Sequence, residues 1–243
     1  MISLAGLVTA LTAAAAIVIA APTTNNPTDG ILEARQSSPP PPVGVHDGYF
    51  YEFWSDLGGN PVSANYSLSP GGGFGVEWDT FPGLTFTFGK GWSGANHNYH
   101  KSIEYEANLT LEEGGALFGV HGFALNPLVE YWIADNYSPV FENWVAMLPR
   151  QDKGEVTTSS GVYRLYLEVR TGFGYPQGVF RLYWAVRQTK RSSGIINTGE
   201  IFSAWASQDM GLNRHEQMLL SVEGWIESRG SAQVEMLGPP GGN

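Results

Sequence analysis

Residues 48–54 read GYFYEFW, an apolar alternation typical of a β-strand. Blocks of the same kind recur at residues 84–88 (LTFTF) and 162–167 (VYRLYL). Glycine clusters at 71–73 and 114–115 supply turns between such blocks. Many short strands separated by turns predict an all-β chain, either a β-sandwich or a jelly roll.

One segment departs from this pattern and is expected to form a helix. Residues 200–210 place Ile201, Ala204 and Trp205 on a common side, which is the spacing of an amphipathic helix. No alternation of strands and helices of the Rossmann kind is present, and no charge run or linker interrupts residues 46–237. We therefore expect a single domain over that range.

The composition narrows the class of protein. The chain has 243 residues and no cysteine, so disulfide scaffolds, thiol nucleophiles and cysteine-ligated metal centres are excluded. Only 15% of residues are charged, while 31 are Gly and 15 are Pro, which argues against helix bundles and coiled coils. The formal net charge of −10 disfavours nucleic acids and anionic membranes as partners, because both need clustered Lys and Arg.

The first 45 residues are expected to lie outside the folded domain. Residues 10–21 are rich in Ala, Ile and Val, and Val18 and Ala20 provide the small residues that a signal peptidase recognises, with an uncleaved anchor as the alternative. Four prolines at 39–42 lie in a polar stretch that cannot bury a core, and Arg35 is a weak candidate for propeptide cleavage. The predicted organisation is a signal peptide at 1–20, a propeptide or Pro-rich linker at 21–45, a β-strand domain at 46–237 and a flexible tail at 238–243. We therefore expect a secreted, extracellular protein.

Two further motifs have the spacing of a cofactor site or a metal site. Residues 89–94 (GKGWSG) match the spacing of a dinucleotide fingerprint, but the loop that follows is rich in Gly, Ser and Asn where that fingerprint needs a helix. His97 and His100 have the spacing of a metal pair, yet no third ligand is apparent in the sequence, which favours solvated loop histidines. We expect neither a cofactor nor a metal site.

Asn-x-Ser/Thr sequons occur at Asn65, Asn108 and Asn136.

Two glutamates stand out because each interrupts an apolar strand beside a tryptophan. Glu130 lies in the segment NPLVEYWI, where alternation puts it on the same face as Trp132. Glu223 lies in SVEGW, on the same face as Trp225. Burying a carboxylate in such a strand is costly, so each needs solvent or a chemical role. Aromatic faces stack on sugar rings, and two carboxylates about 5 Å apart permit double-displacement glycoside hydrolysis. A solvent-facing strand position is the alternative for each.

Six segments, in order along the chain, carry a resemblance to a known family. They are GYFYEFW (48–54), GKGW (89–92), NPLVEY (126–131), YWAVR running into KRSSG (183–194), FSAWA (202–206) and VEG (222–224). The chain thereby resembles the family 11 glycoside hydrolases, the small secreted endo-1,4-β-xylanases, as a divergent member. The resemblance implies a β-jelly roll of two curved antiparallel sheets with one short helix, curled around a xylan-binding cleft. It also implies that Glu130 is the nucleophile and Glu223 the acid/base.

The resemblance extends to residues around the two glutamates. Trp54 matches the sugar-stacking tryptophan of the family's cleft, and Arg170 matches an arginine at the base of its thumb loop. Pro176 lies in the thumb tip, GYPQG, where the sequence departs from the family's pattern. Trp225, which follows Glu223, is included among the residues expected to support substrate binding.

Other cleft positions differ from the family pattern. Trp132 stands where the family has Tyr, His121 where it has the Tyr that hydrogen-bonds the nucleophile, and Phe123 where it has Trp. Thr85 aligns with the residue that tunes the acid/base, and Leu182 with a cleft Gln. Trp132, His121 and Thr85 can still donate hydrogen bonds. Leu182 cannot form one. Losing a hydrogen bond that strengthens in the transition state costs about 10²-fold in rate. A protonated His121 would favour the ionised nucleophile, so we expect it to reshape the pH–rate profile.

The predicted function is that of a secreted, retaining endo-1,4-β-xylanase. It would hydrolyse internal bonds of xylan, or of a related β-1,4-linked polysaccharide, by double displacement, and it is expected to be a monomer. The alternative, favoured by the replaced cleft residues, is a catalytically impaired xylanase-like protein that binds xylan or takes part in extracellular interactions. Neither nucleic acid nor, after signal cleavage, a membrane is expected as a partner.

Overall fold

The predicted β-strand domain is the part of the chain that the computed structural model describes. The described residues are 42–238, apart from 56–63, 81–83, 148–150 and 174–176. The predicted signal peptide, nearly all of the linker, residues 239–243 and the thumb residue Pro176 lie outside them.

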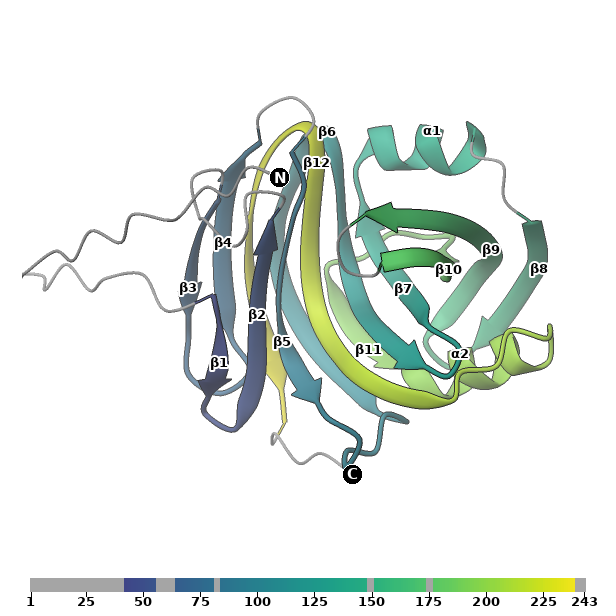
Figure 1. Ribbon diagram of the computed structural model, residues 1–243. Coiled ribbons are helices and arrows are strands. Elements are labelled where there is room, and N and C mark those ends of the chain that lie inside the picture. The colour runs from purple at the N-terminus through teal and green to yellow at the C-terminus, as the bar shows by residue number, and fades with distance from the viewer. Residues whose placement is uncertain (1–41, 56–63, 81–83, 148–150, 174–176, 239–243) are drawn as a thin grey trace, which may run out of the picture. The chain divides into compact units, whose positions relative to one another are not determined.

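Strands dominate the described residues, in agreement with the predicted all-β class (Figure 1). The strands are β1 (Val43–His46), β2 (Tyr49–Ser55), β3 (Ala64–Leu68), β4 (Phe74–Asp79), β5 (Phe86–Ser93), β6 (Ser102–Leu125), β7 (Val129–Tyr137), β8 (Gln151–Thr158), β9 (Gly161–Phe173), β10 (Gln177–Arg187), β11 (Ser193–Asn197) and β12 (Arg214–Leu237). The helices are α1 (Pro139–Met147) and α2 (Thr198–Ala206). The helix expected at 200–210 overlaps α2, whereas α1 is a second helix that was not expected.

The strands form one continuous hydrogen-bonded sheet. Its order is β1-β2-β5-β12-β6-β7-β10-β9-β8, while β4 pairs with β12, β3 with β4, and β11 with β6. Neighbouring strands are antiparallel except β7 and β10, which run parallel. This parallel pair was not predicted, and it is possible because α1, β8 and β9 supply the long crossover that parallel strands need.

The long strands β6 and β12 join the two layers that were predicted as separate sheets. Strand β12 pairs with β5 over Gln217–Gly224 and with β4 over Arg229–Val234, and β6 accompanies it along both stretches. Between the stretches the β6–β12 register shifts after Trp225. Gly114 lies at this bulge with φ +67°, and a Cβ there would meet the Cα of Ser228 at 2.5 Å. Only glycine fits such a position, so Gly114 permits the fold-over between the layers.

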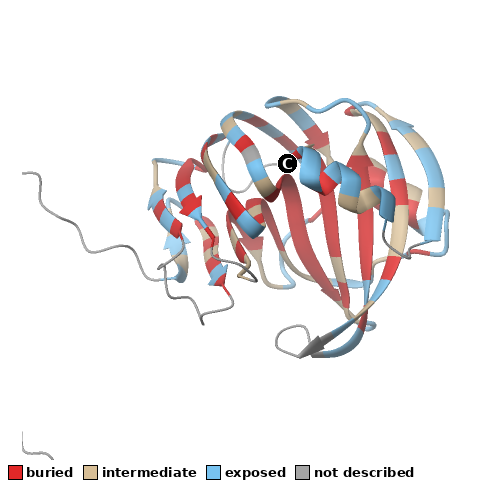
Figure 2. Cartoon of the chain, turned by 90° about the horizontal axis from the view of Figure 1, so that it is seen from above, coloured by how far each residue is buried: buried red, intermediate tan, exposed pale blue. Residues whose placement is uncertain are grey.

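Aromatic side chains fill the space between the two layers. Phe53 of β2 stacks on Tyr66 of β3 with ring centroids 4.8 Å apart. Phe88 of β5 meets Phe74 of β4 edge-to-face at 5.3 Å. Figure 2 shows buried residues grouped on the strands that enclose this core. Such rings bury large apolar areas, so the aromatic content supplies much of the stability of the domain.

The first turn of α1 explains why this helix forms. The Oγ of Ser138 accepts hydrogen bonds from the backbone N–H of Phe141 at 3.2 Å and of Ala116 at 3.0 Å. Pro139 follows at the first helical position, where its missing N–H has no cost. Phe141 and Trp144 then pack on a second apolar cluster, separate from the main core. The Ser138-Pro139 pair at the start of the helix and the three-residue spacing of Phe141 and Trp144 are sequence features that predict a helix here.

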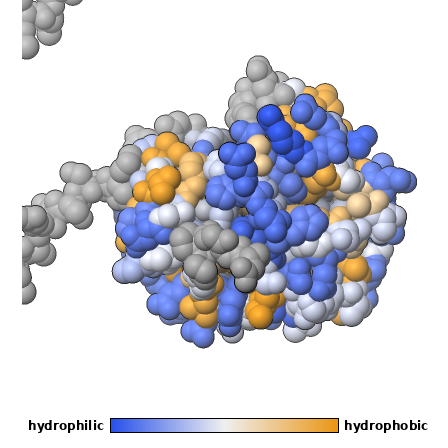
Figure 3. Space-filling model, turned by 90° about the horizontal axis from the view of Figure 1, so that it is seen from below, coloured by the Kyte–Doolittle hydropathy of each residue, from blue (hydrophilic) through white to orange (hydrophobic). Residues whose placement is uncertain are grey.

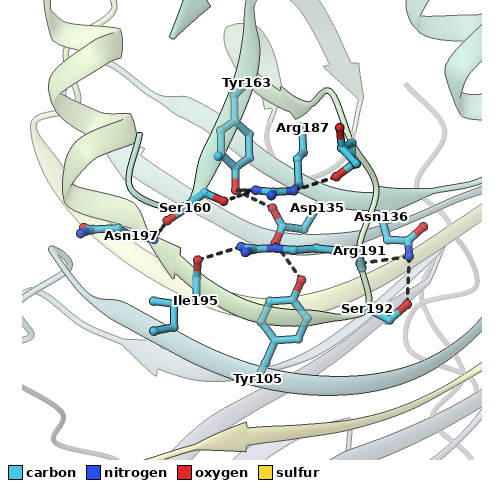
Figure 4. A network of polar contacts seen from close by, with 12 residues as sticks. Tyr105, Asp135, Asn136, Ser160, Tyr163, Arg187, Arg191, Ser192, Ile195 and Asn197 are labelled. Carbon is cyan, nitrogen blue, oxygen red and sulfur yellow. Dashed lines mark hydrogen bonds and ion pairs between the residues drawn. The ribbon is translucent and has the colours of Figure 1, made fainter. Parts of the chain in front are cut away.

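A buried network of polar groups ties β7 to β6, to β9 and to the segment after β10 (Figure 4). Asp135 of β7 is completely buried. Its carboxylate accepts hydrogen bonds from the hydroxyls of Tyr105 and Tyr163, at 2.7 and 2.6 Å, and from the Nε of Arg191 at 2.7 Å. Burial is the largest cause that raises the pKa of both tyrosines, and the negative charge of Asp135 is the second. Their hydroxyls therefore stay protonated and remain donors.

The surface shown in Figure 3 is largely hydrophilic, with apolar side chains scattered over it. Scattered apolar residues of this kind are normal on a folded domain. Neither helix in the described part of the chain has the length and apolar character needed to span a membrane.

His215, near the start of β12, should make the stability of the domain depend on pH. Its ring stacks on Tyr99 at 4.6 Å, and its Nδ1 lies 3.3 Å from the hydroxyl of Tyr131. Burial, and then the neighbouring His100, lower the pKa of His215 from 6.5 to about 4. The unfolded chain takes up this proton near pH 6.5 and the folded chain only near pH 4. The free energy of unfolding therefore decreases as the pH falls through this window, by about 3 kcal/mol in total.

We expect His215→Phe to remove this contribution while keeping a ring stacked on Tyr99. Urea denaturation between pH 7 and pH 4 measures it, and the native protein should lose about 3 kcal/mol more than the variant. His97→Gln is the matched control, because His97 is exposed and should leave the native pH dependence unchanged. The same acid loss in His215→Phe as in the native protein would contradict the prediction.

Candidate active site

A cleft of about 960 Å³ is lined by residues of β2, β5, β6, β7, β9, β10 and β12 and of helix α1. The predicted site residues that line it are Trp54, Thr85, His121, Phe123, Glu130, Trp132, Arg170, Glu223 and Trp225. The structure therefore brings together every predicted site residue that it describes. Leu182, which was expected to have lost a polar contact in the cleft, is completely buried in the apolar cluster beneath α1.

The two glutamates reach the cleft from different strands. Glu130 is the second residue of β7 and lies opposite Phe123 of β6 in the strand register. Glu223 lies in β12, opposite Leu117 of β6. Both side chains are partly exposed. The partly exposed setting suits carboxylates that must stay reactive in contact with a substrate.

Arg170 of β9 supplies positive charge beside this pair. Burial acts to lower the pKa of the Arg170 guanidinium, whereas its hydrogen bond and ion pair with Glu168 act to raise it, and the net effect of all neighbours is a raised pKa. The charges of Glu130 and Glu223 raise the pKa of Arg170 further. The arginine therefore remains charged and lies within electrostatic reach of both glutamates.

Glu168 is a functional neighbour that the sequence analysis missed. This buried carboxylate accepts hydrogen bonds from the Nε and Nη2 of Arg170, at 2.8 and 3.3 Å, and from the indole N–H of Trp184 at 3.1 Å. Glu168 and Arg170 are two residues apart on one strand and so share a face. The two-residue spacing in the sequence therefore predicts that Glu168 can hold Arg170 in place.

His121 contacts the nucleophile candidate directly. Its Nε2 lies 3.0 Å from Oε1 of Glu130, and its ring stacks on Trp132 with centroids 4.4 Å apart. Its Nδ1 is buried and has no hydrogen-bond partner among the described residues. An ionised carboxylate only accepts hydrogen bonds, so Nε2 must carry a proton, and a second proton on Nδ1 would be a buried donor without an acceptor. The geometry therefore favours the neutral tautomer with its proton on Nε2.

We expect His121→Tyr to change the acidic limb of the pH–rate profile. A tyrosine hydroxyl can donate the same hydrogen bond to Glu130, but it has no counterpart of the buried, unpaired Nδ1 of His121. The dependence of kcat/KM on pH, measured on soluble xylan, tests this. His97→Tyr, at an exposed loop position, is the control for adding a tyrosine. If the His121→Tyr and native profiles coincide, the idea fails.

The glycine-rich motif at 89–94 serves packing in this structure. It begins inside β5, and no helix follows it. A Cβ on Gly91 would meet the backbone oxygen of Met218 at 2.2 Å, so glycine allows the close approach of β5 and β12. No group of three or more His, Cys, Asp or Glu side chains in the described part of the chain is placed to hold a metal ion.

A strand-rich domain with two carboxylates and several tryptophans in one cleft has the architecture of a glycoside hydrolase. The family described as Glycosyl hydrolases family 11 matches residues 46–235, and the chain belongs to this family. The predicted resemblance is thereby confirmed.

Individual relatives agree with this assignment. Endo-1,4-beta-xylanase 1 of Pyricularia grisea is 35% identical over 200 residues, which cover 81% of this chain and 80% of that protein. Ethylene-inducing xylanase 4 of Verticillium dahliae is also 35% identical over 200 residues, covering 81% of this chain and 85% of the relative. A solved endo-1,4-β-xylanase structure from Trichoderma reesei has a TM-score of 0.61 and 30% identity, covering 72% of this chain and 92% of that one. The jelly-roll fold is confirmed by this similarity.

Proposed function

We propose that this protein is an exported, retaining endo-1,4-β-xylanase in which Glu130 is the nucleophile and Glu223 the acid/base. The observation that carries the proposal is that both carboxylates line one cleft rich in aromatic side chains. Family membership and the names of the relatives support xylan as the substrate. The apolar segment at 10–21 supports export, and removal of residues 1–20 would release residues 46–237 as a monomeric domain joined to a Pro-rich linker.

The proposed reaction has two displacements. In the first, Glu130 attacks the anomeric carbon while the Glu223 carboxyl gives its proton to the leaving oxygen, so a glycosyl ester forms as the glycosidic bond breaks. In the second, Glu223 takes a proton from a water molecule, which attacks the same carbon and releases Glu130. Each displacement inverts the carbon, so the product keeps the β configuration.

Neighbouring side chains support these steps. The Nε2–H of His121 holds one oxygen of Glu130 and leaves the other for attack. The positive charge of Arg170 lies within electrostatic reach of Glu130 and attracts a carboxylate there. Trp54 has an exposed ring face, 40% accessible, of the kind on which a sugar ring stacks.

A catalytically impaired xylan-binding protein is the second candidate. It is favoured by Leu182, because this apolar residue lies directly beside Glu130 in the β7–β10 register, where the family has a polar side chain. The two candidates differ in turnover and not in binding.

The deciding experiment is hydrolysis of soluble xylan and xylohexaose by the native protein from pH 3 to pH 9, with the first product observed by proton NMR. We expect release of reducing ends and a β-anomer as the first product. An α-anomer would overturn the assigned roles. Retained binding of xylan without turnover at any pH would establish the impaired alternative, and N-terminal sequencing of the secreted protein would test removal of residues 1–20.

A further inference from the structure

Helix α1 carries a tryptophan into the cleft. Trp144 lines the cleft together with Trp225 of β12 and Arg170 of β9. The ring of Trp144 is partly exposed. Together with the buried Phe141 and with Val145, Trp144 packs α1 against the second apolar cluster.

The strand register places α1 on the opposite side of Glu223 from Trp54. On one side of Glu223 lies Thr87 of β5, and beyond it Trp54 of β2. On the other side lies Leu117 of β6, and beyond it Tyr137 at the end of β7. Neighbouring strands are about 4.8 Å apart, so Trp54 and the start of α1 each lie about 10 Å from Glu223, in opposite directions.

The ring of Trp144 is held in a defined orientation. It packs edge-to-face against Trp184 at 5.8 Å and Trp225 at 6.0 Å. Arg170 lies over it, 5.6 Å from the ring centroid. Phe141, one turn earlier, is completely buried and anchors the helix. A ring fixed in this way loses little conformational freedom when a ligand binds, which favours a role in recognition.

The surroundings of Trp144 fit an uncharged sugar. The guanidinium of Arg170, which lies over the ring, is already paired with Glu168 at 2.8 Å. Trp184 and Trp225, which contact Trp144, add two further aromatic side chains to the cleft lining. Apolar ring faces flanked by a few polar groups are typical of sites that bind sugar rings by stacking and fix them by hydrogen bonds.

We propose that Trp144, supported by Trp225, is a sugar-binding platform on the far side of the scissile bond from Trp54. The platform rests on the proposed function and extends it, because the cleft then grips a xylan chain on both sides of the catalytic pair. Trp144 is a specificity-determining residue that sets which bond of an oligosaccharide lies at Glu223.

The test compares cleavage of xylohexaose labelled at its reducing end by the native protein, Trp144→Ala and Trp54→Ala. Removing either platform should lower kcat/KM about tenfold, because one stacking contact is lost. It should also move the most frequent cleavage site, in opposite directions for the two variants. Trp144→Phe should restore the native cleavage pattern. Met147→Ala is the matched control on the same helix, because that side chain is 77% exposed and is not among the residues that line the cleft.

The outcomes separate this inference from the proposed function. If the native protein cleaves xylohexaose but Trp144→Ala keeps the native pattern, or shifts it in the direction of Trp54→Ala, the platform is refuted and the enzyme assignment stands. A thermal destabilisation with an unchanged pattern would show a structural role only and would also refute it. If the native protein shows no turnover, calorimetric titration with xylohexaose still tests the platform, since Trp144→Ala should bind about tenfold more weakly.

Discussion

Replacing Glu130 by Gln should abolish xylan hydrolysis while leaving the fold and the substrate affinity almost unchanged. Gln has the size and shape of Glu, and its amide oxygen can still accept the Nε2–H of His121. An amide cannot form the glycosyl ester, so the first displacement has no nucleophile. We expect kcat to fall by about 10⁴-fold, the scale of losses for residues that act directly on the reacting atoms.

Reducing-sugar release measures kcat, and calorimetric titration with xylohexaose measures the affinity. Glu216→Gln is the matched control, because Glu216 also lines the cleft but belongs to neither catalytic position. It should keep kcat within about threefold of the native value, because surface substitutions outside such sites have small effects. Activity of Glu130→Gln within tenfold of native would contradict the nucleophile assignment. An equal loss in both variants would show that the charge of the cleft matters and that the identity of the carboxylate does not.

Sequence patterns correctly predicted the features of this protein that depend on residues close together in the chain. Alternation along a strand puts Glu130 and Trp132 on one face, and the structure has both in the cleft. The helix at 200–210 was predicted because its apolar spacing is local, although α2 begins and ends earlier, at Thr198 and Ala206. Boundaries differ because capping and tertiary contacts decide the ends of a helix.

Long-range pairing set the limit of prediction from the sequence. The approach of Glu130 and Glu223 depends on the strand order and on the fold-over at Gly114, neither of which is visible in a local pattern. The role of Glu168 depends on Trp184, which is adjacent only because β9 and β10 pair. Helix α1 was missed for a different reason: the cap at Ser138 and the apolar spacing of Phe141 and Trp144 are local signals, but the strand pattern of the flanking segments outweighed them.

Asp135→Asn should be among the most destabilising single substitutions in the domain. It keeps the size of the side chain but removes the negative charge that faces the Arg191 guanidinium, 2.7 Å away. Removing one partner of a buried ion pair leaves the other charge uncompensated, which costs about 3–5 kcal/mol. Arg191 also donates to the carbonyl of Ile195 at 2.7 Å, but a neutral acceptor does not replace a carboxylate. For a domain of this size we expect Tm to fall by about 10 °C.

Asp152 offers the matched control, because it pairs with Arg164 on β9 while both side chains are 45% exposed. Exposed pairs contribute about 0–1 kcal/mol, so Asp152→Asn should have a small effect. The origin of the larger loss is tested by adding Arg191→Met to Asp135→Asn. If an uncompensated guanidinium causes the instability, the double variant should be more stable than the sum of the two single losses predicts. Additive losses, or equal effects at Asp135 and Asp152, would mean that the buried charge pair does not hold β7 in place. The position of Glu130, on the same strand, would then have to depend on the apolar packing of its neighbours in β7, such as Tyr131 and Ile133.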